Sequence, residues 1–409
     1  MIRSLRTGIT GLRSNQLRLD TIGNNIAGVN THGFKRSRVL FQDALAQRIS
    51  TGGRHLGSQP TNISNVGNGV AVGSIDQVWS QGALDYTDLA TDLAVVGDGF
   101  FVANSIQGNI LTRQGATQFN SDGYLVTAGG LRVQGWMASG DGSISTGALQ
   151  DIRIDPSATS PPVQTDTAIV TGNLSAEREA GTDDPVTMST VVYDGAGRAH
   201  TLVAEVVKTG EGEWSVQAAR LVDGDTTTDL AVADGALTFD ENGTLTSGGE
   251  AQVSGAFPNG DALDISLDLT GVSQYGGSTT ASVESQNGSA AGDLVDFGFD
   301  QSGRLILSFS NGVRQPAAQL ALGSVANPDG LDQIGDGFYT TTAASGDLRI
   351  GRPGAEIAAS VVSGALEASN VDLAQEFTDM IVAQRGYQAN ARVITTSDEL
   401  LQETVQLKR

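Results

Sequence analysis

The chain has 409 residues, with 24 basic and 46 acidic side chains, and this balance argues against nucleic acid or an anionic membrane surface as the main partner. Cysteine is absent, which excludes disulfides, thiolate chemistry and Cys-ligated metal sites. Glycine accounts for 53 residues, well above the usual share of about 7 %, and this predicts many short strands and tight turns.

Charge is unevenly distributed along the chain. Residues 1–50 hold eight basic and two acidic side chains, whereas residues 360–409 hold four and seven. The segment between them holds twelve basic and thirty-seven acidic side chains, so the middle is strongly acidic.

No run of about 18 apolar residues occurs, so we expect no membrane span. Residues 1–19 lack a continuous apolar core, so we expect no Sec-type signal peptide.

The first predicted element is a helix over residues 2–26. Six of eight positions at alternating spacings of three and four are apolar, which is typical of the a/d seam of a heptad helix. Gly8, Gly11 and Gly23 each weaken this helix by roughly 1 kcal/mol relative to Ala, so it needs a partner. The seam residues are Ile2, Leu5, Ile9, Leu12, Leu19 and Ile26.

The same spacing recurs from Val371 to Lys408, which predicts a second helix about 55 Å long. Ser369 and Asn370 precede it, and side chains of this type commonly cap a helix start. We expect the two ends to form a coiled coil. Either the helices pair within one chain, or their seams are exposed in the monomer and buried between subunits. The seam residues at this end are Leu373, Phe377, Met380, Tyr387, Ala391, Ile394, Leu401 and Val405.

Between the helices the sequence predicts β structure. One motif, F-[ND]-x-x-G-x-L, begins at Phe119, Phe239 and Phe299, with a looser copy at Tyr193. Asn or Asp accepts local backbone hydrogen bonds and Gly adopts a positive φ, so the motif predicts corners of antiparallel hairpins.

The predicted fold class is mainly β with α-helical termini, built from discontinuous domains: two antiparallel β domains and a terminal coiled coil. Pro-rich residues 155–168 mark one domain boundary. The predicted segments are a helical coiled-coil domain (residues 1–30 with 370–409), an extended linker or arm (31–75), an inner β domain (76–158 with 291–369) and an inserted outer β domain (159–290).

Motifs that carry chemistry are absent. The sequence has no phosphate-binding Gly-rich loop with Lys, no H-E-x-x-H and no G-x-S-x-G. The acidic loop at residues 223–229 lacks the Glu that an EF-hand requires. We therefore predict no catalytic residue, no metal site, no cofactor and no enzyme activity.

Residues 24–36, NNIAGVNTHGFKR, resemble the N-terminal signature of the bacterial flagellar rod and hook family. Residues 366–373 and 380–390 resemble the other end of that family, and residues 92–101 and 111–130 resemble its shared β domain. Gly28 stands where the signature more usually has Asn, which weakens a local turn preference. The signature residues are Asn24, Asn25, Asn30, Thr31, Gly33, Phe34 and Lys35.

Within the family, the block at residues 159–290 favours a hook-type subunit, because rod-type subunits are much shorter, and residues 188–202 resemble the hook outer domain. The alternatives are a distal rod-type axial protein and a secreted acidic β-domain adhesin or hydrolase. A hook-type subunit implies a homopolymer in which the terminal helices form an inner tube. The polymer would be a curved universal joint that transmits motor torque.

The resemblance also implies partners and a destination. The partners are other copies of the chain, the axial proteins of the distal rod, hook cap and hook–filament junction, and the flagellar type III export gate. The protein would reach the extracellular hook without a Sec signal peptide. Phe41 and Leu45 resemble the short motif recognised at the export gate, although alone they read as an ordinary helix fragment.

Overall fold

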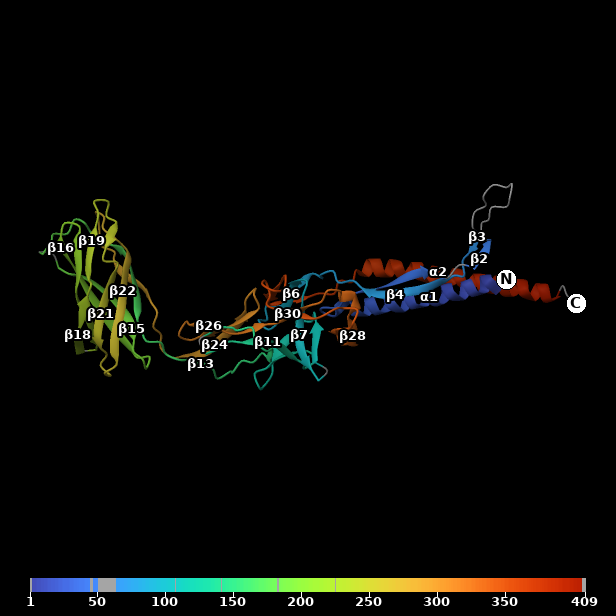
Figure 1. Ribbon diagram of the computed structural model, residues 1–409, viewed down its shortest axis with the longest axis horizontal. Coiled ribbons are helices and arrows are strands. Elements are labelled where there is room, and N and C mark those ends of the chain that lie inside the picture. Colours follow the sequence, from blue (N-terminus) through green and yellow to red (C-terminus); the bar gives the residue numbers. More distant parts are fainter. Residues whose placement is uncertain are drawn as a thin grey trace. The chain divides into compact units, whose positions relative to one another are not determined.

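The computed structural model describes residues 2–44, 47–50, 64–106, 108–140, 142–181, 184–224 and 226–406. The chain is mainly β with a helix at each end, which confirms the predicted fold class (Figure 1). It divides into two compact units. Unit 1 comprises Met1–Asp155, Phe297–Ile306 and Pro316–Arg409, and unit 2 comprises Pro156–Asp296 and Leu307–Gln315.

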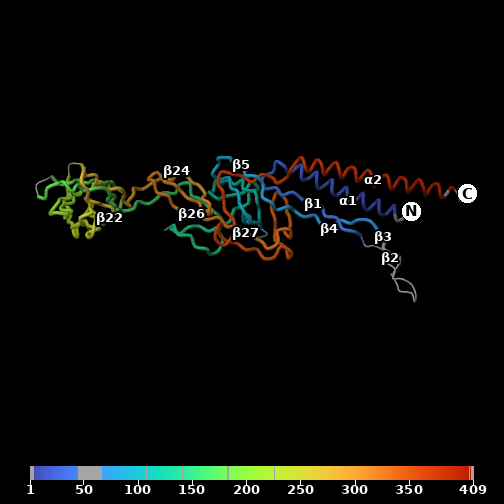
Figure 2. Tube along the Cα trace, turned by 90° about the horizontal axis from the view of Figure 1, so that it is seen from above, coloured from blue at the N-terminus to red at the C-terminus, as the bar shows by residue number. Residues whose placement is uncertain are grey.

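The two terminal helices lie side by side in unit 1 (Figures 1 and 2). They are α1 (Ile2–Ala27) and α2 (Leu373–Gln406). They run antiparallel, since Ser4 near the start of α1 meets Ser397 near the end of α2, with their hydroxyl oxygens 3.4 Å apart. No helix in the described part of the chain is long and apolar enough to cross a membrane.

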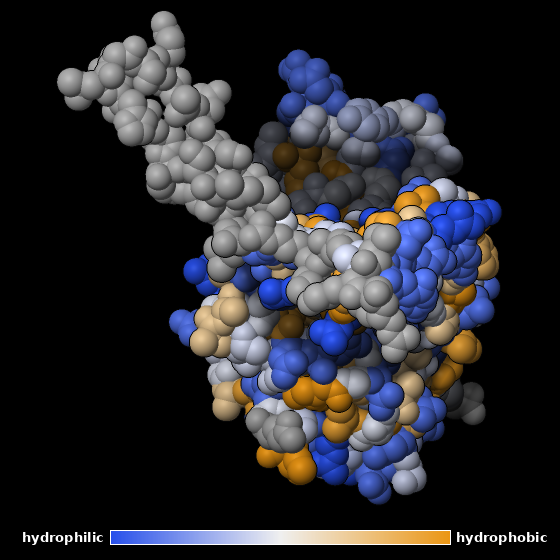
Figure 3. All heavy atoms as spheres, turned by 90° about the vertical axis from the view of Figure 1, so that its right-hand side faces the viewer, coloured by the Kyte–Doolittle hydropathy of each residue, from blue (hydrophilic) through white to orange (hydrophobic). Residues whose placement is uncertain are grey.

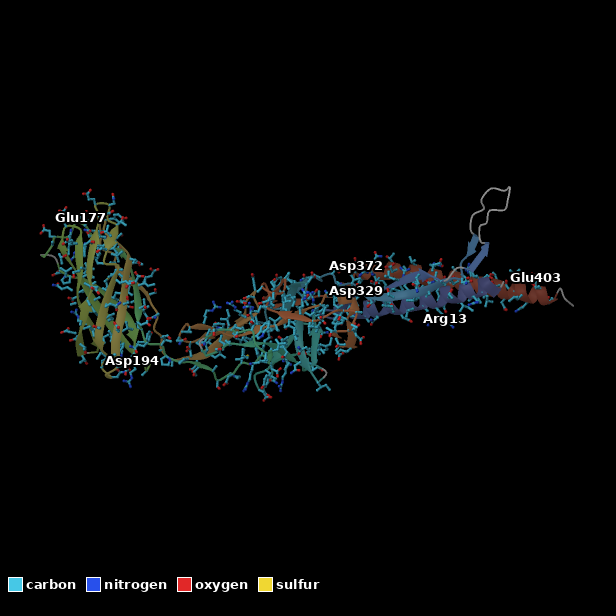
Figure 4. All side chains as sticks on the ribbon, in the orientation of Figure 1. Arg13, Glu177, Asp194, Asp329, Asp372 and Glu403 are labelled. Carbon is cyan, nitrogen blue, oxygen red and sulfur yellow. The ribbon has the colours of Figure 1, made fainter. Side chains whose placement is uncertain are left out.

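The expected cap of α2 by Ser369 or Asn370 is wrong. Asp372, labelled in Figure 4, precedes α2, and its Oδ1 accepts hydrogen bonds from the backbone N–H of Ala374 (2.9 Å) and Gln375 (3.2 Å). Both donors lie in the first turn, where the helix itself offers no acceptor, so a carboxylate directly before α2 is the better placed partner.

Residues 31–75, expected to be an extended arm, contain two antiparallel ladders where the structure describes them. The short helix η1 (Gly28–Asn30) leads into β1 (Ser37–Asp43), which pairs with β4 (Val70–Gln77). A second ladder joins β2 (Gln47–Ser50) to β3 (Ser64–Val66). Phe41 pairs with Val72 in a strand, so its reading as a helix fragment is wrong, and Leu45 lies outside the described residues.

The β domain of unit 1 is built on the strand path β26-β11-β7-β8-β29-β28. Its strands bury continuous apolar runs such as Leu93–Val95, all fully buried. Its elements are β5 (Leu84–Tyr86), β6 (Leu93–Gly97), β7 (Phe100–Ser105), β8 (Gly108–Thr112), β9 (Thr117–Phe119), β10 (Leu125–Thr127), β11 (Arg132–Met137), β12 (Gln150–Asp151), β26 (Arg314–Leu320), β27 (Leu322–Ser324), η2 (Pro328–Gly330), β28 (Asp332–Gly335), β29 (Phe338–Thr340), β30 (Arg349–Gly351), β31 (Ala359–Ser363) and β32 (Ala365–Glu367).

Unit 2 contains a ten-stranded sheet with the path β15-β16-β17-β18-β21-β22-β14-β23, and β19 and β20 extend it from β17. Its pairs are antiparallel except β14 with β22, which is parallel. Alternate residues of its long strands point into a core around Trp214. Its strands are β13 (Thr159–Ser160), β14 (Thr167–Asn173), β15 (Val186–Tyr193), β16 (Ala199–Gly210), β17 (Glu213–Asp223), β18 (Thr226–Ala233), β19 (Ala236–Phe239), β20 (Leu245–Ser247), β21 (Glu250–Ala256), β22 (Ala262–Ser273) and β23 (Ser282–Gln286), followed by β24 (Gly292–Phe299) and β25 (Arg304–Phe309), which the division into units cuts.

The repeated motif forms hairpin corners, as predicted. Asp240 Oδ1 accepts hydrogen bonds from the N–H of Asn242 and Thr244, at 3.0 and 2.8 Å. Gly243 has φ +77°, and a Cβ there would collide with the Gln274 carbonyl. Matching oxygens cap the corners of the other copies, at Asn120, Asp194 and Asp300.

Removing the carboxylate in Asp372→Ala should destabilise the first turn of α2 by about 1 kcal/mol, because two backbone N–H groups lose their acceptor. Hydrogen exchange of Ala374 and Gln375 should accelerate, while exchange in the middle of α2 stays unchanged. Asp372→Asn keeps an oxygen acceptor and should restore most of the protection. Equal exchange in the Ala variant and the parent chain would contradict the assignment of this cap.

Candidate subunit interface and its buried junction

The faces on which α1 and α2 meet are small and polar. On α1, Gly8, Gly11 and Ser14 are buried, and on α2 Ala383 and Ser397 are buried. Arg18 Nη2 and Asp379 Oδ1 form an ion pair between the helices, 2.8 Å apart. Small side chains let the two helix backbones approach closely, and the apolar Ile22 and Ile394 contribute to the same contact.

Most of the predicted seam residues are already partly buried in the single chain, and Leu373, Phe377 and Tyr387 are the more exposed ones among those described. Phe377 is 51 % exposed and Leu373 39 %. Ile394 lies against Gly8, so it contributes to pairing within the chain. Val405 lies in α2, but its side chain is outside the described part. The partly exposed seam residues are Leu5, Ile9, Leu12, Leu19, Ile26, Met380, Ala391, Ile394 and Leu401.

The heptad pattern did not predict several further exposed apolar residues on α2 and on the β1–β4 ladder. Apolar and polar side chains are interspersed over the surface seen from the helix end of unit 1 (Figure 3). A strict a/d seam is a narrow stripe, whereas the exposed apolar residues of α2 lie on several of its faces. The additional residues are Ile381, Val382, Val393 and Leu400 on α2, and Leu40, Phe41, Val70 and Ile75 on the ladder.

A cavity of about 210 Å³ lies where α1, β1 and α2 meet. Arg18 and Arg36 line it, and each is already paired with a carboxylate of α2, Asp379 at 2.8 Å and Glu376 at 3.4 Å. Phe41 forms part of the rim and is 42 % exposed. Arg38 also lines the cavity and lies 3.9 Å from Asp76, so each of the three arginines has a carboxylate partner within the chain.

Below the helices, three charged side chains form a buried junction. Lys35 Nζ lies 2.6 Å from Glu367 Oε1, and Arg113 Nη1 lies 3.5 Å from Glu367 Oε2. All three side chains are at most 5 % exposed. Burial lowers the pKa of Lys35, and the hydrogen bond to Glu367 opposes this shift. Burial likewise lowers the pKa of Arg113.

Backbone groups complete the junction. Lys35 Nζ donates to the Ser80 carbonyl at 2.9 Å, and the Gly82 N–H donates to Glu367 Oε1 at 3.0 Å. Arg113 Nη2 donates to the Gly97 carbonyl at 2.8 Å. A buried charge is costly unless it is paired and hydrogen-bonded, and these contacts provide both. The junction therefore ties the arm, β32 and the loop after β8 together.

Two asparagines fasten the arm to both helices. Asn25 on α1 donates to the Ser37 carbonyl and accepts from the Ser37 N–H, both at 2.8 Å. It also donates to Glu376 Oε2 on α2 at 3.2 Å. Asn370 accepts from the Arg36 N–H at 2.8 Å and donates to the Val78 carbonyl at 2.7 Å. Each side-chain amide thus provides a hydrogen-bond partner for backbone groups at a strand edge, which would otherwise have none.

The structure brings four of the seven signature residues to this junction. Asn25 and Lys35 bind as described. Gly33 adopts φ +71°, and a Cβ there would lie 2.9 Å from the Arg113 carbonyl oxygen, so this position requires glycine. Phe34 packs on Gly28, where a Cβ would lie 2.7 Å from the ring. Gly28 thus accommodates the Phe34 ring in this chain. Asn24, Asn30 and Thr31 are exposed.

Sequence reasoning missed the partners of Lys35. Glu367 and Arg113 lie inside the segments that resemble the family, yet nothing in their spacing indicates that they meet. They are 254 residues apart in the chain. The available signal was a single charged residue in each of two largely apolar segments, the acidic Glu367 and the basic Arg113.

An aromatic cluster lies in the β domain, just after the end of the arm. Trp79 packs edge-on against Phe100 and Tyr339, with ring centroids 5.2 and 5.1 Å apart. Arg113 lies over the Phe100 ring at 5.1 Å. Burial raises the pKa of Tyr339 to about 12.

Replacing Lys35 with Met should destabilise unit 1 by about 3 kcal/mol, because Glu367 would stay buried without its nearest cation. Hydrogen exchange of β6 and β7 should accelerate, and exchange of β16 in unit 2 should not. Arg352→Gln, which breaks the exposed Arg352–Glu356 pair, is the matched control and should leave β6 and β7 unchanged. Unchanged exchange in Lys35→Met would show that the junction contributes little to stability.

Unit 1 should also lose stability above pH 10 through Tyr339. Its folded pKa of about 12 lies above the ordinary tyrosine value of 10.0, so its contribution is complete below pH 10 and is lost as pH rises toward 12. Two pKa units correspond to about 2.7 kcal/mol. Urea unfolding of the parent chain and of Tyr339→Phe should show a stability difference that changes between pH 9 and 12. A constant difference would contradict this role of Tyr339.

Comparisons with known proteins agree with this geometry. Four family profiles match: flagella basal body rod protein (residues 5–35), flagellar hook protein FlgE/F/G D1 domain (94–171), flagellar basal body protein FlaE D2 domain (173–289) and flagellar basal body rod FlgEFG protein C-terminal (362–407). These segments cover most of α1, all of α2, the strands from β7 to β13 and the strands from β15 to β23.

Relatives match along the whole chain. Flagellar hook protein FlgE of Borreliella burgdorferi is 37 % identical and that of Treponema pallidum 36 %, each covering all of both chains. The Salmonella typhimurium protein of the same name is 33 % identical over 99 % of this chain and all of its own. A crystal structure of Helicobacter pylori flagellar hook protein FlgE2 shares the fold, with a TM-score of 0.50 at 16 % identity, covering 69 % of this chain and all of that one. These matches favour the hook-type subunit over the rod-type and adhesin alternatives. The chain belongs to the family of flagellar hook proteins.

Proposed function

We propose that this structural subunit of the flagellar hook polymerises into a curved tube that acts as a universal joint and transmits motor torque to the filament. The observation that carries the proposal is the outward position of apolar side chains around the helix pair. Phe377 and Ile381 are 51 % and 58 % exposed, although both lie on a helix that packs within the chain. Neighbouring copies would bury these side chains, and apolar burial contributes roughly 25 cal/mol per Å².

We assign the polymer interface to the seam residues of both helices. On this assignment, residues 1–30 with 370–409 form the inner tube, and residues 31–75 connect it to the β domains. Residues 76–158 with 291–369 form an inner β shell, and residues 159–290 form an outer one. The exposed apolar residues Leu40, Phe41, Val70 and Ile75 of the β1–β4 ladder extend the same surface beyond the helices.

The charge distribution supports different roles for the two ends and for the middle of the chain. Residues 1–50 are net basic and residues 360–409 are net acidic, so the ends of neighbouring copies attract each other. Residues 51–359 hold twelve basic and thirty-seven acidic side chains, which disfavours tight dry contact between outer domains. Cohesion would then come from the tube, while the outer domains slide over wet, polar contacts as the hook rotates.

Three further assignments follow from the hook function. Axial partners would be the distal rod below, the cap during growth and the hook–filament junction above. Export would proceed through the flagellar type III gate to the cell exterior, with Phe41 and Leu45 as the gate motif. Phe41 is 42 % exposed on β1, and in an unfolded chain it would be free for recognition. We also propose that the protein has no enzymatic activity.

Charged substitutions at Phe377 and Ile381 test the polymer proposal. Phe377→Asp/Ile381→Asp should remain a folded monomer, because both side chains are already half exposed in the single chain. Each substitution should raise the critical concentration for polymerisation about tenfold, since it removes roughly 1–1.5 kcal/mol of apolar burial. Sedimentation and electron microscopy measure the polymer, and circular dichroism measures the fold.

The matched control is Thr396→Asp, which adds the same charge at an exposed polar position of α2. It should assemble like the parent chain. Normal assembly of the double variant would overturn the interface assignment. Loss of assembly in the control as well would show that added negative charge, rather than lost apolar burial, is responsible.

A further inference from the structure

The two helices share a short pattern at the centre of their contact. Gly11 and Asn15 on α1, and Gly386 and Asn390 on α2, both follow Gly-x-x-x-Asn. Because the helices run antiparallel, each asparagine lies over the glycine of the other helix. A Cβ on Gly11 would be 2.7–2.8 Å from the amide atoms of Asn390, and a Cβ on Gly386 would be 3.0 Å from Asn15 Oδ1.

The spaces beside Gly11 and Gly386, here called notches, are therefore each filled by an asparagine of the other helix. Neither notch leaves room for a further side chain. Asn15 Nδ2 donates to the Gly11 carbonyl at 2.8 Å, which holds the side chain along its own helix and leaves Oδ1 toward Gly386. Real Cβ atoms essentially never approach other atoms closer than 3.0 Å, so any residue larger than Gly at position 11 displaces Asn390. The four residues form a reciprocal clasp.

The contacts on either side of the clasp share its register. Ser4 faces Ser397 near one end of the helix pair, and Asn25 bonds Glu376 near the other. A slip of one turn that placed Asn15 opposite Asn390 would set Gly11 opposite Ile394 and Gly386 opposite Leu19, so neither glycine would face an asparagine. A heptad repeat of apolar residues matches itself again after a slip of seven residues, so the seam distinguishes such registers poorly.

We infer that the Gly11–Asn15 and Gly386–Asn390 clasp is the determinant that selects the antiparallel register of the helix pair. These are positioning residues: they fix which apolar side chains of α1 and α2 face outward together. Their consequence for assembly rests on the proposed polymer function. The register itself belongs to the single chain and is measured without assembly.

The absence of cysteine allows a direct measurement of register in the full-length chain. Ser4→Cys/Ser397→Cys places two thiols where the hydroxyl oxygens are 3.4 Å apart, close enough for a disulfide after small adjustment. Ser4→Cys/Leu401→Cys reports a slip of one turn. Oxidation of dilute monomer should crosslink the first pair at least about tenfold faster than the second, and gel mobility separates intrachain from interchain products.

Exchanging the clasp residues then tests the clasp itself. Gly386→Asn should slow the Ser4Cys–Ser397Cys crosslink about tenfold, because two asparagine side chains would compete for one notch, and overpacking of this kind typically costs 1–3 kcal/mol. Asn15→Gly/Gly386→Asn moves the notch to the other helix and should restore the rate to within about twofold. The matched control is Gly23→Asn on α1, where a Cβ would meet nothing within 4 Å, and it should crosslink like the parent.

The inference is supported if the in-register crosslink slows in Gly386→Asn and its rate recovers in Asn15→Gly/Gly386→Asn. Parent-like crosslinking in Gly386→Asn, failure of the exchange to recover, or equal rates for the in-register and slipped reporters would each overturn it. Polymerisation is scored separately on the same variants in reducing buffer. A chain that crosslinks in register but does not polymerise contradicts the proposed function and leaves the clasp intact.

Discussion

The close approach of α1 and α2 through glycine, asparagine and serine is the contact on which the rest of the architecture depends. A helix pair that met through its leucines and isoleucines would satisfy its own apolar surface and would have little left to offer another molecule. Here Gly11 and Gly386 accept asparagine side chains, and Phe377 and Ile381 remain outside. The intrachain contact combines small, polar and a few apolar side chains such as Ile394, whereas the apolar residues left outside are the ones that the proposed interface would bury. Separating the two contacts lets the chain fold its ends and still keep a surface for copies of itself.

The junction at Lys35, Glu367 and Arg113 gives the helix pair a rigid base. An apolar contact between arm and domain would tolerate sliding, because burial of apolar surface is not directional. A buried carboxylate held by two cations and a backbone N–H tolerates little displacement, since any movement leaves a charge without a partner in a medium of low dielectric. The Trp79–Phe100–Tyr339 cluster beside it adds the apolar area that an ionic contact lacks. Such a combination suits an element that transmits force.

The two β units differ in the way they bury apolar residues. Unit 1 buries continuous runs such as Leu93–Val95, while the long strands of unit 2 alternate between core and solvent. Solvent-facing positions of unit 2 can therefore carry the acidic residues that dominate the middle of the chain without disturbing its core. A strongly acidic outer surface favours hydrated contacts between copies, which form and break more readily than the apolar contacts assigned to the helices.

The sequence by itself determined the two terminal helices and the hairpin corners, because these depend on periodicity and on local chemistry, but it did not predict the strands of residues 31–75. The heptad spacing predicted α1 and α2, and F-[ND]-x-x-G-x-L predicted corners whose Asn or Asp oxygens accept the expected backbone hydrogen bonds. It also placed the signature that identifies the family. It could not pair Lys35 with Glu367, replace Asn370 by Asp372 as the cap, or show that Asn15 meets Gly386. Such contacts join residues far apart in the chain or depend on which neighbour reaches a backbone group first. Only the tertiary structure decides them, because the energy of each contact depends on distances that no local pattern specifies.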